Sequence, residues 1–317
     1  MFCRCKLHRQ TSEGANIMKQ TRKSFIALIL PALVVYVLFM LVPLVASLAL
    51  SFFEWTGYGE KTFVGFANFV KLFTVDPYPT RLLNALGNNL YFFIVTMVIQ
   101  NAVALILAVL LQRGLKGTKF FRAIFYAPAT VSVTIVGFLW TLIFNPIWGP
   151  LNVSLRALGL DSLALSWTGN ESTALLYVAI AHAWQYTGIP MMLFIAALNN
   201  ISDDQYEAAE IDGGNGWHKF WYITIPNIKS IIFIVTTMTF VGNLSAFEVV
   251  YAMEGTLAGP NYSTDILGTF FYRTCFGART GSPPDMGLGA AIAAVMTLII
   301  GIGVVFWLRM YTKQDEQ

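Results

Sequence analysis

Six long stretches without an interior lysine or arginine decide what this sequence can fold into. A bilayer with a hydrocarbon core about 30 Å thick needs roughly 20 apolar residues of helix to cross it. The apolar residues run continuously rather than alternating, so a closed β-barrel is excluded and helices must satisfy the backbone. The sequence therefore predicts an all-α integral membrane protein with six transmembrane helices. The predicted spans are residues 25–53, 89–111, 123–144, 173–198, 231–253 and 286–308.

Composition also favours a bilayer as the solvent. Of the 317 residues, 56% are hydrophobic and 12% are charged, whereas a soluble domain carries roughly a quarter charged residues. The first stretch is longer than the hydrophobic region of a signal peptide, about 7–15 residues, so we expect a retained span. Cys3, Cys5 and Cys275 are too few for a disulfide framework. For Cys3 and Cys5 a tail segment is favoured over a metal site, because the polar, basic residues around them show no periodicity.

The basic residues predict the orientation of the chain. With both termini inside, fourteen lysines and arginines lie on the cytoplasmic side and six on the outside. Basic residues concentrate in cytoplasmic segments, so we expect both ends in the cytoplasm. The expected parts are an inner tail (1–24), a first span (25–53), an outer loop (54–87), a core of five helices (88–310) and an inner tail (311–317). The first 17 residues fit a disordered tail or a start codon placed too far upstream.

The predicted inner loop 199–230 has the pattern of a short amphipathic helix followed by an aromatic-rich segment, residues 217–222. Ser202 and Gln205 form a capping-box pattern, in which the hydroxyl accepts the amide of the third helical residue and the glutamine reaches back. Five acidic residues follow before Gly213 and Gly214, which supply the left-handed conformation of a helix end. Such a helix suits insertion into a groove of a partner. The alternative is a helix lying on lipid, which the acids disfavour because the inner leaflet is negative.

This loop also carries a family signature. Glu207-Ala208-Ala209, three residues, Gly213, nine residues and then Ile223-x-Ile225-Pro226 follow the EAA motif of ABC importer permeases, with Ile225 where leucine is usual. Segments 63–69, 120–128 and 139–146 are similar to other conserved parts of these permeases. The chain resembles the carbohydrate-uptake branch, typified by glycerol-3-phosphate and maltose systems, with a type I importer permease fold and cytoplasmic coupling helices.

The resemblance implies an assembly in a bacterial or archaeal cytoplasmic membrane. It has a second permease subunit as heterodimer partner, two cytoplasmic ABC ATPases and one extracytoplasmic sugar-binding protein, without nucleic acid. Carried over by position, Glu207, Ala208, Ala209 and Gly213 contact the ATPase, with Glu207 paired to a basic group. Asp212 stabilises the turn, and Pro226 sets the start of the fifth span.

Nothing in the chain itself predicts catalysis. The phosphate-binding pattern GxxxxGK[ST] is absent from the sequence. Glu248, His182 and Cys275 lie on separate segments without the context of a catalytic motif. We expect no enzyme activity, no bound cofactor and no metal site; ATP and Mg²⁺ belong to the partner ATPase.

Polar and aromatic residues in spans four and five suggest a substrate path. Polar groups inside a bilayer are costly and tend to face cavities or helix contacts. The candidates are Trp184, Gln185, Tyr186, Asn243, Phe247 and Glu248. Interhelical packing is the alternative for each of them, and it is favoured for His182. Glu248 departs from the aspartate common in the family, and 255–260 is a looser version of a Gly-Gly-Gly-Pro segment.

Two other functions fit six spans. An ion-coupled secondary transporter of small polar solutes predicts paired acids within the membrane and internal symmetry, whereas Glu248 is the only acid inside the predicted spans. A membrane scaffold that anchors an ATPase without moving solute is the second alternative, and a transport assay separates it.

Overall fold

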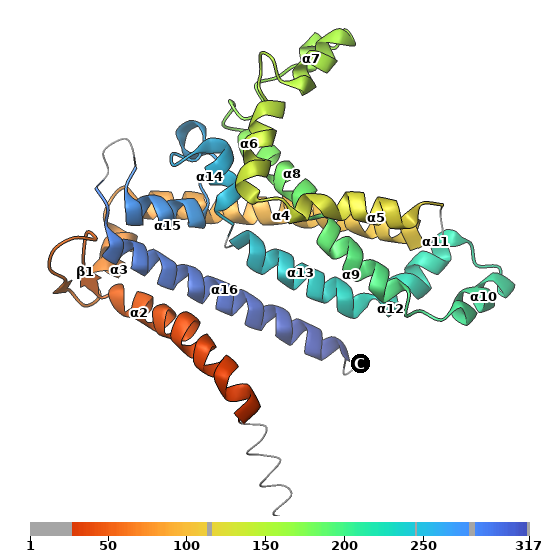
Figure 1. The fold of residues 1–317 in the computed structure, drawn as a ribbon, viewed down its shortest axis with the longest axis horizontal. Coiled ribbons are helices and arrows are strands. Elements are labelled where there is room, and N and C mark those ends of the chain that lie inside the picture. The colour runs from red at the N-terminus through yellow and green to blue at the C-terminus, as the bar shows by residue number, and fades with distance from the viewer. Residues whose placement is uncertain (1–26, 113–115, 245, 279–282, 316–317) are drawn as a thin grey trace, which may run out of the picture.

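The computed structural model describes residues 27–112, 116–244, 246–278 and 283–315. The predicted N-terminal tail, with Cys3 and Cys5, lies outside them. Helices dominate, and the longest run side by side along the long axis of the molecule (Figure 1). One end carries the hairpin of α10 (Asp203–Ile211) and α11 (Gly216–Lys219), and we name it the α10 end. The other end carries α3 (Ala67–Thr74) and α15 (Leu267–Phe276), and we name it the α15 end.

The length and apolarity of the helices agree with six spans. Three helices are long and apolar enough to cross a membrane, and the described residues give six candidates if each of three bent helix pairs is one span. The unbroken spans are Ala27–Leu50, Tyr78–Gln112 and Met286–Arg309. The bent pairs are Thr118–Thr130 with Val133–Ile143, Ala174–Tyr186 with Gly188–Leu198, and Gly216–Asn227 with Lys229–Leu244.

The first span diverges from the other helices (Figure 1). It contains the π-helical turn η1 (Val37–Leu41) followed by α2 (Val42–Leu50). Pro43 lacks the N–H that would bond to the Phe39 carbonyl, which explains the wider turn. A short hairpin of β1 (Phe53–Glu54) and β2 (Thr62–Phe63) leads to α3.

The second span begins within the loop predicted over 54–87. Helix α4 covers Tyr78–Gln112, 35 residues. Its polar first part looks unlike a membrane span, but Asn84 and Asn88 donate to the carbonyls of Tyr262 and Asp265, at 3.0 and 2.8 Å. These contacts to a distant loop explain why the helix starts earlier than hydropathy predicted.

The third and fourth spans are bent, which the predicted continuous helices missed. Helices α5 (Thr118–Tyr126) and η2 (Ala127–Thr130) meet α6 (Val133–Ile143) at 100°. Val131 is extended there, and its carbonyl accepts from the Gln185 side chain at 3.0 Å. Helices α8 (Ala174–Tyr186) and α9 (Gly188–Leu198) meet at 47°. Pro190 cannot donate to the Tyr186 carbonyl, which weakens the helix at this bend.

The predicted span 231–253 is wrong at its second half. Helix α13 covers Lys229–Leu244, and α14 (Glu248–Glu254) is a separate helix. The Asn243 carbonyl accepts the Asn89 side-chain amide at 3.0 Å, so α4 supplies a partner where α13 ends. The remaining helices are α7 (Pro150–Ala157), η3 (Asp161–Leu163), η4 (Phe220–Thr224), α12 (Ile225–Asn227), η5 (Pro260–Tyr262) and α16 (Met286–Asp315).

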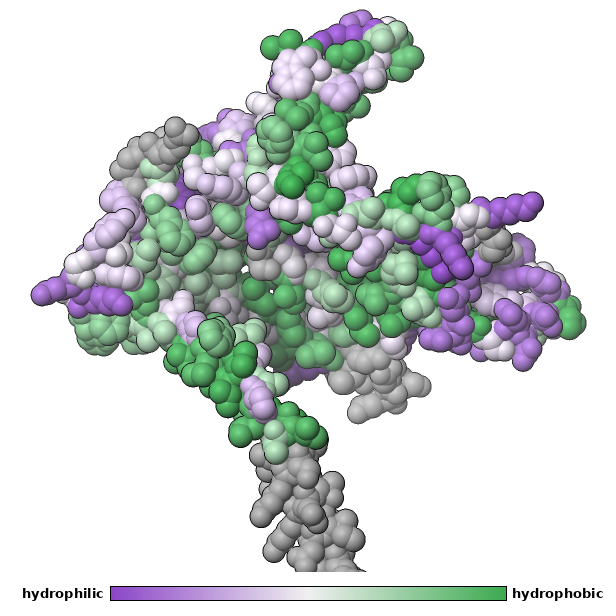
Figure 2. Space-filling model, in the orientation of Figure 1, coloured by the Kyte–Doolittle hydropathy of each residue, from purple (hydrophilic) through white to green (hydrophobic). Residues whose placement is uncertain are grey.

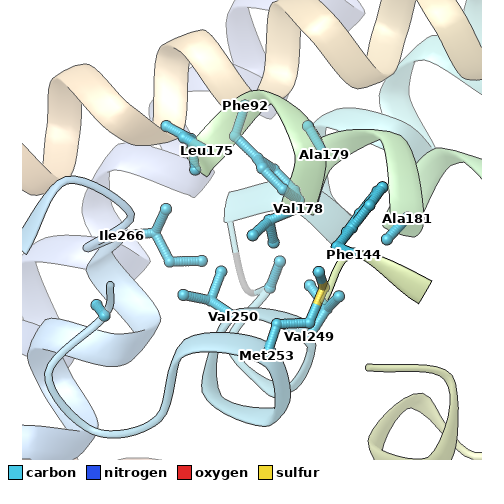
Figure 3. Close-up of a cluster of buried hydrophobic side chains, with 12 residues drawn as sticks. Phe92, Phe144, Leu175, Val178, Ala179, Ala181, Val249, Val250, Met253 and Ile266 are labelled. Carbon is cyan, nitrogen blue, oxygen red and sulfur yellow. The ribbon is translucent and has the colours of Figure 1, made fainter. Parts of the chain in front are cut away.

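Apolar side chains from helices distant in sequence form the core around these breaks. One cluster joins Phe92 of α4, Phe144, Val178 of α8 and Val249 of α14 (Figure 3). A second, including Met191 and Leu198, lies under the α10 end. The short helix α14 is therefore packed between α6 and α8, and this packing fixes the residues that follow the end of α13.

Candidate functional site

The hairpin at the α10 end has its first helix capped at the N-terminus by Ser202. The Ser202 hydroxyl accepts the Asp204 amide at 3.3 Å, one residue earlier than the capping-box pattern predicted. Gln205 does not reach back, because its side-chain oxygen accepts from the Asn227 amide at 3.0 Å. Half of the capping box is thus replaced by a contact with the second part of the loop.

A Schellman motif ends this helix, as the glycine pair predicted. Gly213 is left-handed, with φ +80°, and its amide donates to the Glu210 carbonyl at 3.0 Å. The Gly214 amide donates to the Ala209 carbonyl at 2.7 Å. These bonds satisfy the last carbonyls of the helix and require a residue at Gly213 that tolerates positive φ. Asp212 occupies the C-cap position, where its amide donates to the Ala208 carbonyl.

Three side-chain pairs tie α10 to the returning half of the hairpin. Gln205 pairs with Asn227, Tyr206 with Thr224 (3.0 Å between hydroxyl oxygens), and Glu210 with Lys219. Together they cover the length of α10. The pairs hold α10 to the segment that leads directly into α13, and we name them the hairpin pairs.

The exposed face of α10 carries most of the predicted coupling residues. Glu207, Ala208, Asp212 and Gly213 are exposed, and Ala209 is half-buried. Pro226 is exposed in α12, within the continuous helix Gly216–Asn227 and directly after the π-helical turn η4. It has no N–H to bond to the Tyr222 carbonyl, which agrees with the wider turn before it. Figure 2 shows hydrophilic residues gathered over this end and hydrophobic ones over the helices between the two ends. The geometry offers a short acidic helix to a partner.

A cavity of about 370 Å³ lies where α13 ends and α14 begins. It brings together four of the predicted path residues: Tyr186, Asn243, Phe247 and Glu248. The other lining residues are Gln100, Val133, His182, Ile189, Pro190, Leu193, Val235, Met238, Thr239, Gly242, Ala246 and Val249. The lining is largely apolar with a few polar groups, which is the usual character of a small-molecule site.

Trp184 and Gln185 lie outside this cavity. Gln185 is fully buried and holds the bend after η2 through its bond to Val131. Trp184 is exposed and packs edge-on against Trp140, with ring centroids 5.6 Å apart. Successive residues of a helix point about 100° apart, so neighbours of Tyr186 in sequence face other directions.

Sequence reasoning assigned His182 to packing, but it lines the cavity. Helical spacing could have found it, since His182, Tyr186, Ile189 and Leu193 recur at the interval of one helix face. Its Nδ1 is buried without a hydrogen-bond partner among the described residues, and its ring interacts with the Asn243 side chain. Thr239 was also missed, although it lies one turn before Asn243 on α13.

Asn243 is held by groups from other helices. Its side-chain amide donates to the Thr96 hydroxyl, and its carbonyl accepts from Asn89. Asn89 also accepts the Leu267 amide at 2.7 Å, which links the cavity to the start of α15. Asn243 is therefore preorganised in the cavity wall by α4, a helix about 150 residues earlier in the chain.

The loop between α14 and α15 is fastened by a buried ion pair. Arg273 and Asp265 form two bonds, at 2.5 and 3.1 Å, and Thr269 donates to the same carboxylate at 2.7 Å. Tyr262 lies between the guanidinium groups of Arg81 and Arg273, 4.7 and 4.8 Å from its ring centre. At the start of this loop, burial raises the pKa of the Glu254 carboxyl to about 7, against the opposing effect of a hydrogen bond from Thr168.

Apolar helices around a cavity, with an exposed acidic hairpin at one end, are the architecture expected of a membrane permease. The chain belongs to the family described as binding-protein-dependent transport system inner membrane component, which residues 100–314 match. This finding confirms the resemblance to ABC importer permeases drawn from the EAA motif.

Individual relatives support the same assignment. The "Probable ABC transporter permease protein YurN" of Bacillus subtilis is 37% identical over 86% of this chain and 90% of its own. The lactose transport system permease protein LacF of Rhizobium radiobacter is 32% identical over 90% and 93%. A chain of a bacterial ABC transporter involved in the import of the acidic polysaccharide alginate has the same fold, with a TM-score of 0.72, 21% identity and coverage of 94% and 99%. The predicted type I permease fold is thereby confirmed.

Proposed function

We propose that this chain is a permease subunit of an ATP-driven, binding-protein-dependent importer that moves a sugar across the cytoplasmic membrane. The hairpin of α10 and α11, which we name the docking hairpin, carries the proposal. It offers an exposed helix with Glu207. The hairpin pairs tie this helix to the segment that leads into α13, and α13 lines the cavity. Because the sequence has no phosphate-binding loop of its own, the energy for transport enters through such a contact.

The α10 end faces the cytoplasm in this proposal. The distribution of lysine and arginine supports it, with fourteen on that side and six on the other. Two ABC ATPases then contact the coupling helices of this chain and of a second permease subunit. Closure of the ATPases moves the two permeases as rigid bodies between inward and outward openings.

The α15 end then faces the outside and receives a sugar-binding protein. A solved relative with a TM-score of 0.71 and 22% identity is described as a bacterial alginate ABC transporter in complex with an alginate pentasaccharide-bound periplasmic protein. A sugar as cargo is supported by relatives named for lactose and for arabinooligosaccharides. The cavity adds hydrogen-bonding groups beside the Phe247 ring, which suit hydroxyl groups and the C–H face of a sugar.

The test compares two single variants, each of which removes one acidic charge from α10. Glu207→Gln should weaken co-purification of the ATPase and lower uptake in reconstituted liposomes at least tenfold, since an unpaired charge is left on the partner. Asp203→Asn is the matched control, an exposed acid of the same helix outside the motif, and should behave as wild type. Unchanged ATPase binding and uptake in the Glu207→Gln variant contradict the proposal. Uptake that stops with a proton uncoupler at constant ATP supports a secondary transporter instead.

A further inference from the structure

Four aromatic rings form a continuous strip across α14 and α15. Phe247 stacks on Tyr272, with ring centroids 4.7 Å apart, and Tyr272 lies 4.9 Å from Phe276. Tyr251 contacts both Phe247 and Tyr272, at 5.2 Å in each case. The Tyr251 and Tyr272 side chains also hydrogen bond with one another. We name Phe247, Tyr251, Tyr272 and Phe276 the aromatic strip.

The strip leads from the cavity to the α15 end. Phe247 lines the cavity, beside the exposed carboxylate of Glu248. Tyr272 and Phe276 lie one turn apart on α15, which runs alongside α4 (Figure 1), and Phe276 is the last residue of α15. Tyr251 is 38% exposed and Phe276 is 56% exposed. The strip is therefore an open surface that ends in a cavity, rather than a part of the core.

The backbone holds the strip in place. A Cβ atom on Gly268 would lie 2.9 Å from the Phe247 Cβ and 2.7 Å from the Ala246 carbonyl oxygen, so α15 approaches Phe247 closely because residue 268 is glycine. The buried pair of Arg273 and Asp265 fixes the adjacent face of α15. The rings therefore need little ordering when a ligand binds, which lowers the cost of binding.

We infer that the aromatic strip is a sugar-binding track that guides the substrate from the outer face into the cavity; this inference rests on the proposed function. A pyranose presents a face of C–H groups that packs on an aromatic ring, while its hydroxyl groups reach the Tyr251 hydroxyl and the Glu248 carboxylate. A belt of aromatic residues at a membrane interface lies at one depth. This strip instead follows α15 along the long axis of the molecule and ends in the cavity.

The test uses the complete importer, with its second permease, ATPases and binding protein, in liposomes. Uptake is measured for a panel of radiolabelled neutral sugars: lactose, arabinose, arabinotriose and maltotriose. Tyr272→Leu removes the ring and should lower the rate at subsaturating sugar about fivefold, which is the effect of losing one aromatic contact of about 1 kcal/mol. Tyr272→Phe keeps the ring and should stay within about twofold of wild type.

Two controls separate the track from other roles of the same surface. Tyr58→Leu removes an aromatic side chain that is 80% exposed and lies outside the strip, and uptake should not change. Co-purification of the second permease and ATPase activity without sugar should be the same in Tyr272→Leu as in wild type.

Three other results would contradict either the sugar-binding track or the proposed function. Equal uptake by Tyr272→Leu and Tyr272→Phe overturns the inference and leaves the proposed function standing. Loss of the second permease from the Tyr272→Leu complex also overturns it and makes the strip a subunit interface. Failure of the assembled wild-type complex to import any sugar of the panel overturns the sugar assignment and the track with it.

Discussion

The docking hairpin is held by contacts between residues close in sequence, whereas the cavity is held by contacts between residues far apart in sequence. The hairpin is one continuous segment in which the hairpin pairs join residues 9 to 22 positions apart. The cavity takes its lining from α4, α6, α8, α9, α13 and α14, and the bond that fixes Asn243 to Thr96 spans 147 positions. The hairpin is therefore a local unit that one stretch of sequence specifies, whereas the cavity exists only after the helices have packed.

Because of this difference, a substitution in the docking hairpin should disturb the hairpin without destabilising the helices around the cavity. Gly213→Val forces a β-branched residue to φ +80°, at a strain of about 1–3 kcal/mol. We expect loss of the Schellman motif, loss of ATPase co-purification and uptake below a tenth of wild type. Detergent-solubilised chain should keep its thermal stability within a few degrees. Gly216→Val is the matched control, because Gly216 has open space around a Cβ and no positive φ; a defect as large there would show that the turn is not the cause.

A change in the cavity wall should instead lower thermal stability and leave ATPase binding intact. Asn243→Leu leaves His182 without its partner, and an unsatisfied buried group costs about 1–3 kcal/mol. It also removes the amide donor to the Thr96 hydroxyl, which keeps its bond to the Phe92 carbonyl. Uptake should fall about tenfold and thermal stability should decrease, while ATPase co-purification is retained. Met238→Leu, an apolar exchange in the same lining, should change uptake less than twofold. If Asn243→Leu released the ATPase, the two regions would not be separable.

The same difference explains what the sequence could predict. The helix end at Gly213 and the acidic face of α10 follow from neighbouring residues, and the structure contains both. Apolar length predicted the spans. The bend of the third span and the end of α13 were missed because they depend on distant partners: Gln185 bonds to Val131 at that bend, and Asn89 bonds to Asn243 where α13 ends.

The residues of the cavity were predicted only in part, for the same reason. Four of the six predicted path residues line the cavity, but polarity alone does not distinguish neighbours on a helix that point in different directions. Gln185 is polar because the backbone at Val131 needs a donor, not because it faces the cavity. Helical spacing from Tyr186 distinguishes His182 from Trp184; the contribution of Gln100 depends on how α4 packs.

The hairpin pairs join α10 to the segment that leads into α13, so they connect the docking hairpin with a helix of the cavity. A double-mutant cycle of Tyr206→Phe and Thr224→Val should give a coupling of about 0.5–1.5 kcal/mol in thermal or chemical unfolding. The double variant should still bind the ATPase but import fewer sugar molecules per ATP, since α10 moves with less effect on α13. Thr237→Val is the control, a threonine on α13 whose hydroxyl bonds to its own helix at 2.9 Å. Unchanged stoichiometry in the double variant would show that the pairs only stabilise the loop.

The smallest effect is expected at Glu254, the last residue of α14. Its pKa is raised to about 7 in the folded protein from an ordinary value of 4.5, mainly because burial disfavours the charged form. A raised carboxyl pKa means that the folded state binds the proton more tightly, so its contribution to stability is complete below pH 4.5 and is lost as pH rises through 7. A pKa of about 7 against 4.5 corresponds to roughly 3 kcal/mol for a fully buried carboxyl, and solvent screening of this partly buried group reduces the effect to roughly 1 kcal/mol. We therefore expect the apparent Tm in detergent to fall by about 2–4 °C between pH 5 and pH 8. Glu254→Gln keeps the shape without the titration and should flatten this part of the profile, whereas Glu60→Gln, an exposed acid near the first span, should leave the slope unchanged. A slope that survives Glu254→Gln would assign the pH dependence to other groups.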